Sequence, residues 1–140
     1  MAVISITRLR VRSWRYLPMF FLQALRAARQ AAKANGNLGT RLLREGRNIF
    51  WTATSWANEA EMKAFMHAPP HGTVMRSLLE WCDEAALVHW TQEGNQLPSW
   101  QEAHTRLQSD GRRSKVKHPS TAHNTFQIAA PKSTRDFQLK

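Results

Sequence analysis

The part of this chain that most constrains its fold is residues 48–71, which read NIFWTATSWANEAEMKAFMHAPPH. The first nine of these residues are rich in aromatic and β-branched side chains, which favour a strand. Asn58, followed three residues later by Glu61, is a pattern like a capping box and predicts the start of a helix. Pro69 and Pro70 then end that helix. The stretch therefore predicts a strand, a tight corner, a capped helix and a break that ends in a histidine.

Alternation and helical periodicity predict the other elements. Strands are expected over residues 3–12, 38–44, 48–56 and 85–91, and helices over residues 17–34, 58–68 and 99–110, with a further helical piece from about residue 73 that includes Cys82. The turn at residues 45–47 is so short that the strands on either side of it should pair as an antiparallel hairpin. The order β-α-β-β-α-β plus an extra C-terminal helix defines the ferredoxin-like split βαβ arrangement, an α+β fold.

A sheet of this kind carries its helices on one face and leaves the other face open. The open face of this chain would include large aromatic side chains, which soluble proteins seldom leave in contact with water as a continuous patch. Two such sheets packed face to face in a homodimer would bury these side chains. We therefore expect a homodimer.

Length and composition limit the remaining possibilities. A chain of 140 residues with 42% hydrophobic content forms one domain, which we expect over residues 1–111. Residues 112–140 lose all periodicity and are basic, so we expect an extended or partly disordered arm. No apolar run approaches the roughly 18 residues that span a bilayer, and the N-terminus lacks the order of a signal peptide. The single cysteine, Cys82, excludes an internal disulfide and fits a cytoplasmic protein.

The net charge of +10 is unevenly distributed along the chain. Residues 1–47 hold ten Lys and Arg residues and one acidic residue. Residues 48–111 hold three Lys and Arg residues and eight acidic residues, and residues 112–140 hold seven Lys and Arg residues and one acidic residue. The basic flanks can lie on the acidic middle segment, within the chain or across a dimer. They can also attract anions in general.

Three arginines on the first strand, Arg8, Arg10 and Arg12, share one face and form a candidate anion-binding site. Guanidinium groups bind carboxylate and phosphate well, although a solvated strand end would show the same pattern. The tail segment GRRSKVKH is basic, but it belongs to no recognised nucleic-acid-binding module and its aromatic content is low. Specific nucleic-acid binding is therefore not expected.

Three segments resemble a known family: FWTATSWANEAEMKAF followed by His71, then LLEWCDEAALVHW, then LPSWQEAHTRLQSDGR. They are similar to uncharacterised proteins of the dimeric α+β barrel superfamily. That superfamily includes antibiotic-biosynthesis monooxygenases, spheroidene-monooxygenase-like proteins, haem-degrading monooxygenases and chlorite dismutases. The resemblance covers about residues 3–118. The haem-degrading members have a helix tryptophan and a later axial histidine, whereas this chain has Phe65 and Met75.

The resemblance implies a site for chemistry with dioxygen, because cofactor-free oxygenases of this fold act on electron-rich substrates that themselves activate dioxygen. Such a site needs apolar walls, hydrogen-bond donors and a proton acceptor. The substrate-binding residues that we expect are Thr7, Phe50, Thr52 and Trp56, and the candidate catalytic residues are His71 and His89. An ordinary aromatic core and dimer interface would explain the same aromatic residues.

Each candidate histidine also has a plain structural interpretation. His71 follows the Pro-Pro break, where the resembling family also has a histidine, and it is either a general base, a haem ligand or a cap of the broken helix. His89 faces the cleft if Trp90 packs under the helices, and is otherwise a core histidine with satisfied hydrogen bonds. His67 and His71 are four residues apart, but the prolines between them break the helical geometry of a metal-binding pair, so no metal site is expected.

The sequence therefore predicts a monooxygenase-like protein that binds a small apolar molecule, aromatic or isoprenoid, in a cleft between sheet and helices. It would act without a cofactor. One alternative is a non-catalytic module for ligand binding or dimerisation. A further alternative is a haem-binding member of the fold with His71 or His89 as axial ligand.

Overall fold

A computed structural model describes residues 1–68, 77–132 and 136–140 of the chain. The strands are β1 (Ala2–Val11), β2 (Asn37–Glu45), β3 (Ile49–Trp56), β4 (Cys82–Gln92), β5 (Arg112–Arg113) and β6 (Asp136–Gln138). The helices are a short 3₁₀ turn η1 (Trp14–Tyr16), then α1 (Leu17–Lys33), α2 (Glu59–His67), α4 (Trp100–Asp110) and α5 (Thr121–Asn124). None of the described helices is long and apolar enough to cross a membrane.

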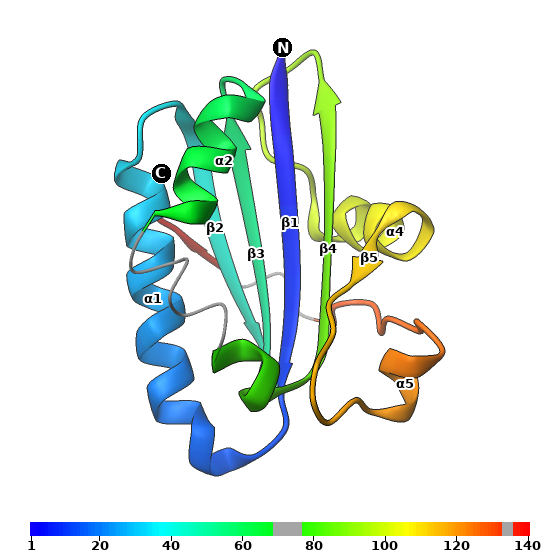
Figure 1. The fold of residues 1–140 in the computed structure, drawn as a ribbon. Helices are drawn as coiled ribbons and strands as arrows, with labels where there is room; N and C mark the ends of the chain where they lie inside the picture. The colour runs from blue at the N-terminus through cyan, green and yellow to red at the C-terminus, as the bar shows by residue number, and fades with distance from the viewer. Residues whose placement is uncertain (69–76, 133–135) are drawn as a thin grey trace.

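The strands form one antiparallel sheet in the order β5-β4-β1-β3-β2-β6 (Figure 1). Its four central strands have the order 4-1-3-2 of the ferredoxin-like split βαβ arrangement, so the predicted α+β fold is confirmed. The hairpin of β2 and β3 is also confirmed, and its turn contains Gly46 with φ of 58°. A left-handed residue is what such a tight turn needs, and glycine takes that conformation at no steric cost.

The predicted helix ends are likewise observed. The Asn58 side chain accepts a hydrogen bond from the Glu61 backbone N–H at 2.9 Å, and Ser99 does the same for Glu102 at 3.1 Å. Gly36, with φ of 83°, follows α1 closely, and glycine takes this left-handed conformation at no steric cost. A Cβ atom on Gly36 would lie 2.6 Å from the Glu61 side chain, so the close approach of α2 to this turn also requires glycine.

One prediction about the elements is wrong. Cys82 does not lie in a helix but is the first residue of β4, which begins three residues before the expected Ala85. The early start places Glu84, a charged residue of low strand propensity, inside β4 and opposite Arg10 of β1. It is tolerated there because Arg8 and Arg10 on the neighbouring strand neutralise its charge, and a local pattern does not show this compensation.

The two faces of the sheet are covered by different parts of the chain (Figure 1). Helices α1 and α2 pack on one face, around Phe20, Phe50 and Trp56. Helix α4 packs on the other face, where Trp100 meets Trp51 edge to face with ring centroids 6.3 Å apart. The expectation that a single chain leaves this second face open is therefore wrong, because α4 and residues 126–128 cover it.

The C-terminal residues are built into the same sheet. We expected residues 112–140 to form an extended or partly disordered arm, but β5 pairs with β4 and β6 pairs with β2, one at each edge. Between them, Ile128 packs in the core beneath α4, and the Trp100 indole N–H donates to Asp136 at 2.8 Å. The sequence missed these elements because two- and three-residue strands are too short to show a period.

The cover of the second face can be tested by Trp100→Ala. Trp100 is only 4% exposed, so its removal leaves a large cavity between α4 and the sheet. We expect the free energy of unfolding, measured with urea, to fall by about 3–5 kcal/mol. The matched control is Gln101→Ala on the exposed side of the same helix, expected within about 0.5 kcal/mol of wild type. Equal effects of the two changes would contradict this packing.

Candidate functional site

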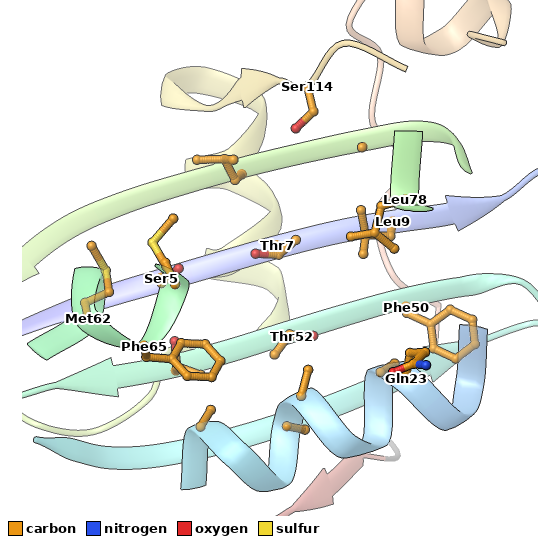
Figure 2. A pocket seen from close by; sticks show the side chains of 18 of the residues that line it. Ser5, Thr7, Leu9, Gln23, Phe50, Thr52, Met62, Phe65, Leu78 and Ser114 are labelled. Carbon is orange, nitrogen blue, oxygen red and sulfur yellow. The ribbon is translucent and has the colours of Figure 1, made fainter. Parts of the chain in front are cut away.

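A cavity of about 130 Å³ lies between the sheet and the two helices α1 and α2. Its floor is formed by β1, β3 and β4, its roof by α1 and one end by α2 (Figure 2). The lining residues used below are Ser5, Thr7, Gln23, Ala24, Ala27, Ala28, Ala31, Phe50, Thr52, Thr54, Trp56, Met62, Phe65, Leu87, His89 and Ser114.

Strand alternation explains which floor residues face the cavity. Side chains two residues apart point to the same side of a strand, so Ser5 and Thr7 of β1 share one side. In the observed register Thr7 lies opposite Thr52, and Ser5 lies between Thr54 on one neighbour and His89 on the other. Figure 2 shows Thr7 and Thr52 side by side on adjacent strands beneath α1. A polar band therefore crosses the middle of the floor.

The ends of the cavity are apolar and aromatic. Phe20 of α1 lies 4.7 Å from Phe50, centroid to centroid, and Phe65 of α2 stacks on Trp56 at 5.3 Å. Both Phe50 and Trp56 are at most 1% exposed. The roof is made largely of alanine, which keeps α1 close to the sheet without filling the space below it. The cavity thus has the composition of a small-molecule site, apolar walls with few polar groups.

The polar groups of the floor differ in whether they already have partners. The Trp56 indole N–H donates to the Thr54 hydroxyl at 2.8 Å. Among the described residues, the hydroxyls of Ser5, Thr7 and Thr52 have no hydrogen-bond partner. The three residues are half-buried, and their hydroxyls are not among the buried side-chain atoms that lack a partner. These three hydroxyls are therefore available to hold a polar atom of a ligand.

His89 is the titratable group of the floor. Burial first, and then the positive charge of Arg112 on β5, lower the pKa of His89 below its ordinary value of 6.5. On α2, Glu59 acts against this shift and Lys63 adds to it. The imidazole is therefore neutral at pH 7, and a neutral imidazole is a proton acceptor. The site combines a base with an apolar surface and unpartnered hydroxyls.

The structure brings together most of the predicted site. Thr7, Phe50, Thr52, Trp56 and His89 all line the cavity, and Trp90, on the opposite side of β4, packs against the α4 face. His71 lies outside the residues that the structure describes. Their roles in substrate binding and catalysis stay predictions.

The sequence analysis missed two groups of lining residues. The alternation of the strands groups Ser5 with Thr7 and Thr54 with Thr52, but neither Ser5 nor Thr54 was among the expected site residues. The roof residues Gln23 and Ala27 could not be found in this way, because nothing local shows which part of α1 lies above which strand.

The three arginines of the predicted anion site lie outside the cavity and are paired within the chain. Arg8 contacts Glu84 at 2.6 Å, and Arg10 contacts the other oxygen of the same carboxylate at 3.0 Å. Arg12 contacts Glu80 at 3.0 Å. This matches the open alternative that the basic N-terminal segment lies on the acidic middle of the chain. Anion binding by these side chains stays a prediction.

The pair of Arg8 and Glu84 is buried, and it joins the C-terminal segment to the sheet. Burial raises the pKa of Glu84, but hydrogen bonds from Arg8 and from the Ser120 hydroxyl outweigh this effect, so its pKa lies below the ordinary value. Burial also raises the pKa of Cys82 to about 12, so this thiol is an inert apolar side chain. In the described part of the chain no group of three His, Cys, Asp or Glu residues could hold a metal ion.

A family model for a domain of unknown function, DUF3291, matches residues 21–136. The chain belongs to the DUF3291 family. The match includes the helices that cover the cavity and the C-terminal segment that covers the opposite face. No curated protein matches the chain.

Solved structures similar to this chain include monooxygenase-like and uncharacterised proteins. The cofactor-independent oxygenase SnoaB from Streptomyces nogalater is 21% identical with a TM-score of 0.52, over 66% of this chain and 94% of SnoaB. A candidate antibiotic biosynthesis monooxygenase from Deinococcus radiodurans is 14% identical with a TM-score of 0.58, over 66% and 93%. Rv0793 from Mycobacterium tuberculosis is 9% identical with a TM-score of 0.60, over 67% and 97%. At such identities the likeness establishes the fold and leaves the reaction open.

A structural role of Arg8 predicts that Arg8→Met weakens the packing of β1 against β4, because the buried Glu84 carboxylate loses its shortest ion pair and keeps only Arg10 and Ser120 as partners. The free energy of unfolding should then fall by about 1–3 kcal/mol, the usual loss of a hydrogen bond to a charged group. The double variant Arg8→Met/Glu84→Leu removes both charges and should recover most of this loss. Urea unfolding of the three proteins measures both effects. If Arg8→Met is as stable as wild type, the pair of Arg8 and Glu84 does not stabilise the sheet.

Proposed function

We propose that the cavity binds a small aromatic substrate and that the protein is a cofactor-independent oxygenase of the monooxygenase-like fold. The observation that carries this proposal is the combination, in one apolar cavity, of three unpartnered hydroxyls and the neutral His89. The monooxygenase-like neighbours support it at the level of the fold.

The size of the cavity narrows the substrate class that we predicted. Its volume of about 130 Å³ is close to that of an engineered apolar cavity of about 150 Å³ in another protein that binds benzene. One aromatic ring therefore fits. An isoprenoid chain would have to extend beyond the cavity, so the geometry favours the aromatic alternative.

The chemistry that fits these groups begins with a phenol. His89 would take the proton of the phenolic hydroxyl, and the Thr7 and Thr52 hydroxyls would hold the ring in place. The electron-rich phenolate would then react with dioxygen. One oxygen atom enters the ring to give a quinone and the other leaves as water, together with the two hydrogen atoms that the ring and its hydroxyl lose. The phenol supplies all four electrons that dioxygen accepts, so no external reductant is needed.

Two alternatives use the same residues. A non-catalytic binding module would need the cavity but not the base, so substrate turnover separates the two functions. Haem binding through His89 or His71 is favoured less, because a macrocycle of four rings is larger than a cavity that suits one ring. After haem is added, we therefore expect no Soret band that depends on His89, so wild type and His89→Ala should give the same spectrum.

We also propose that the predicted homodimer does not form through the sheet face that α4 covers, but through another surface. The sheet face that would pair in a barrel carries Trp51 and Ala53, and α4 covers both in the single chain. Sedimentation velocity of the purified protein tests the oligomeric state directly.

The first test of the base is His89→Gln. Oxygen consumption with a panel of phenols should fall by roughly 10²- to 10⁴-fold, the usual contribution of a general base. Because the pKa of His89 is lowered, the wild-type rate should be constant near pH 7 and fall only below pH 6.5. The variant should lose this acid limb. The matched control is His67→Gln on the exposed end of α2, which should keep both rate and profile.

The test of the floor is Thr52→Val, which removes the hydroxyl and keeps the shape. Calorimetric titration with phenol should show a dissociation constant roughly 2- to 10-fold weaker, the loss of one neutral hydrogen bond. Toluene, which has no hydroxyl, should bind both proteins equally. Thr91→Val, at an exposed position of β4, is the control. Equal weakening for phenol and toluene would mean that the hydroxyl does not contact the ligand.

A further inference from the structure

The outer surface of η1 and α1 exposes large apolar side chains. Trp14 is 81% exposed, and Met19 and Leu22 are each 49% exposed. They are among the most exposed large hydrophobic residues in the described part of the chain. Trp14 precedes α1, while Met19 and Leu22 lie three residues apart on its first two turns. An exposed tryptophan flanked by two further apolar side chains is a patch that water covers poorly.

The same helix face continues as a row of cations. Arg26, Arg29 and Lys33 follow Leu22 at helical spacing, and all three are exposed. The opposite side of α1 is buried against the sheet through Phe20 and Ala28. The outer side therefore has an apolar end and a basic end, and we call it the outer face of α1, made of Trp14, Arg15, Met19, Leu22, Arg26, Arg29 and Lys33.

The charge of this face is not balanced within the chain. The first acidic residue in the sequence is Glu45, so neither η1 nor α1 contains one. In the part of the chain that the structure describes, Arg26, Arg29 and Lys33 take part in no ion pair, unlike Arg8 on the neighbouring strand. These cations therefore keep their full attraction for an external anion.

We propose that the outer face of α1 binds the surface of an anionic lipid bilayer. Tryptophan is the side chain most suited to the boundary between headgroups and hydrocarbon, because its ring is apolar and its N–H is polar. A basic amphipathic helix with a bulky apolar end lies in that boundary, with its cations at the lipid phosphates. A projecting Trp14 on a convex surface suits a soft bilayer, whereas a protein partner would need a matching pocket.

The position of this helix links the surface to the cavity. The side of α1 that faces the sheet supplies Gln23, Ala24 and Ala27 to the roof of the cavity. The bilayer, where small apolar molecules concentrate, would thus lie one helix away from the site. This consequence rests on the proposed function, while binding to the bilayer does not.

The test is flotation of the protein with vesicles of phosphatidylcholine alone or mixed with phosphatidylglycerol, without substrate. We expect binding to the anionic vesicles at low salt and release at high salt, because salt screens surface charges. Arg26→Gln/Arg29→Gln should weaken partitioning into the vesicles roughly 30-fold, since each basic residue near the membrane surface contributes roughly fivefold to binding. Trp14→Ala should weaken it roughly tenfold through lost apolar burial.

The matched control is Lys115→Gln/Lys132→Gln, which removes the same net charge from exposed positions outside α1 and should bind like wild type. Unchanged circular dichroism and urea midpoints establish that the variants fold. The proposal is overturned if wild type does not bind anionic vesicles, if the control loses as much as the α1 variants, or if Trp14→Ala changes the mass in sedimentation velocity, which would make the face a protein interface. If His89→Gln does not reduce turnover, the proposed function fails, but the measured binding of the protein to vesicles is not affected.

Discussion

The pairing of β1 with both β3 and β4 is the constraint on which the rest of the structure depends. Every residue of β1 from Val3 to Arg10 has a partner on both sides, so the register of three strands is set together. Because side chains alternate, one register places Ser5 and Thr7 in the cavity and Ile4 and Ile6 beneath α4. A shift by one residue would exchange these sets and bury the hydroxyls in the core.

The two faces of the sheet are packed differently. Beneath α4, large side chains such as Trp51 and Trp100 pack against each other in the core. Beneath α1, the alanine-rich helix cannot fill the distance to the threonines of the floor, and a cavity remains. The cavity thus lies on the side of the sheet that α1 and α2 cover.

Local sequence patterns were enough for the main elements of the fold. Some structural signals involve only a few neighbouring residues and are therefore visible in the sequence. They include the capping residues Asn58 and Ser99, the turn at Gly46 and the alternation of β1. The same alternation grouped Phe50, Thr52 and Trp56, and all three line the cavity. Cys82 was misplaced because the strand that contains it is stabilised by charges from another strand.

The sequence by itself determined the order of the main elements and which side chains share one side of a strand, because these depend on spacing along the chain. Tertiary structure alone decided that α4 and Ile128 cover the second face, that Arg8 pairs with Glu84, and that α1 leaves a cavity. Contacts between residues far apart in the chain carry no local period, so only the packed molecule shows them. They also decide what surrounds His89, and therefore why its pKa is lowered.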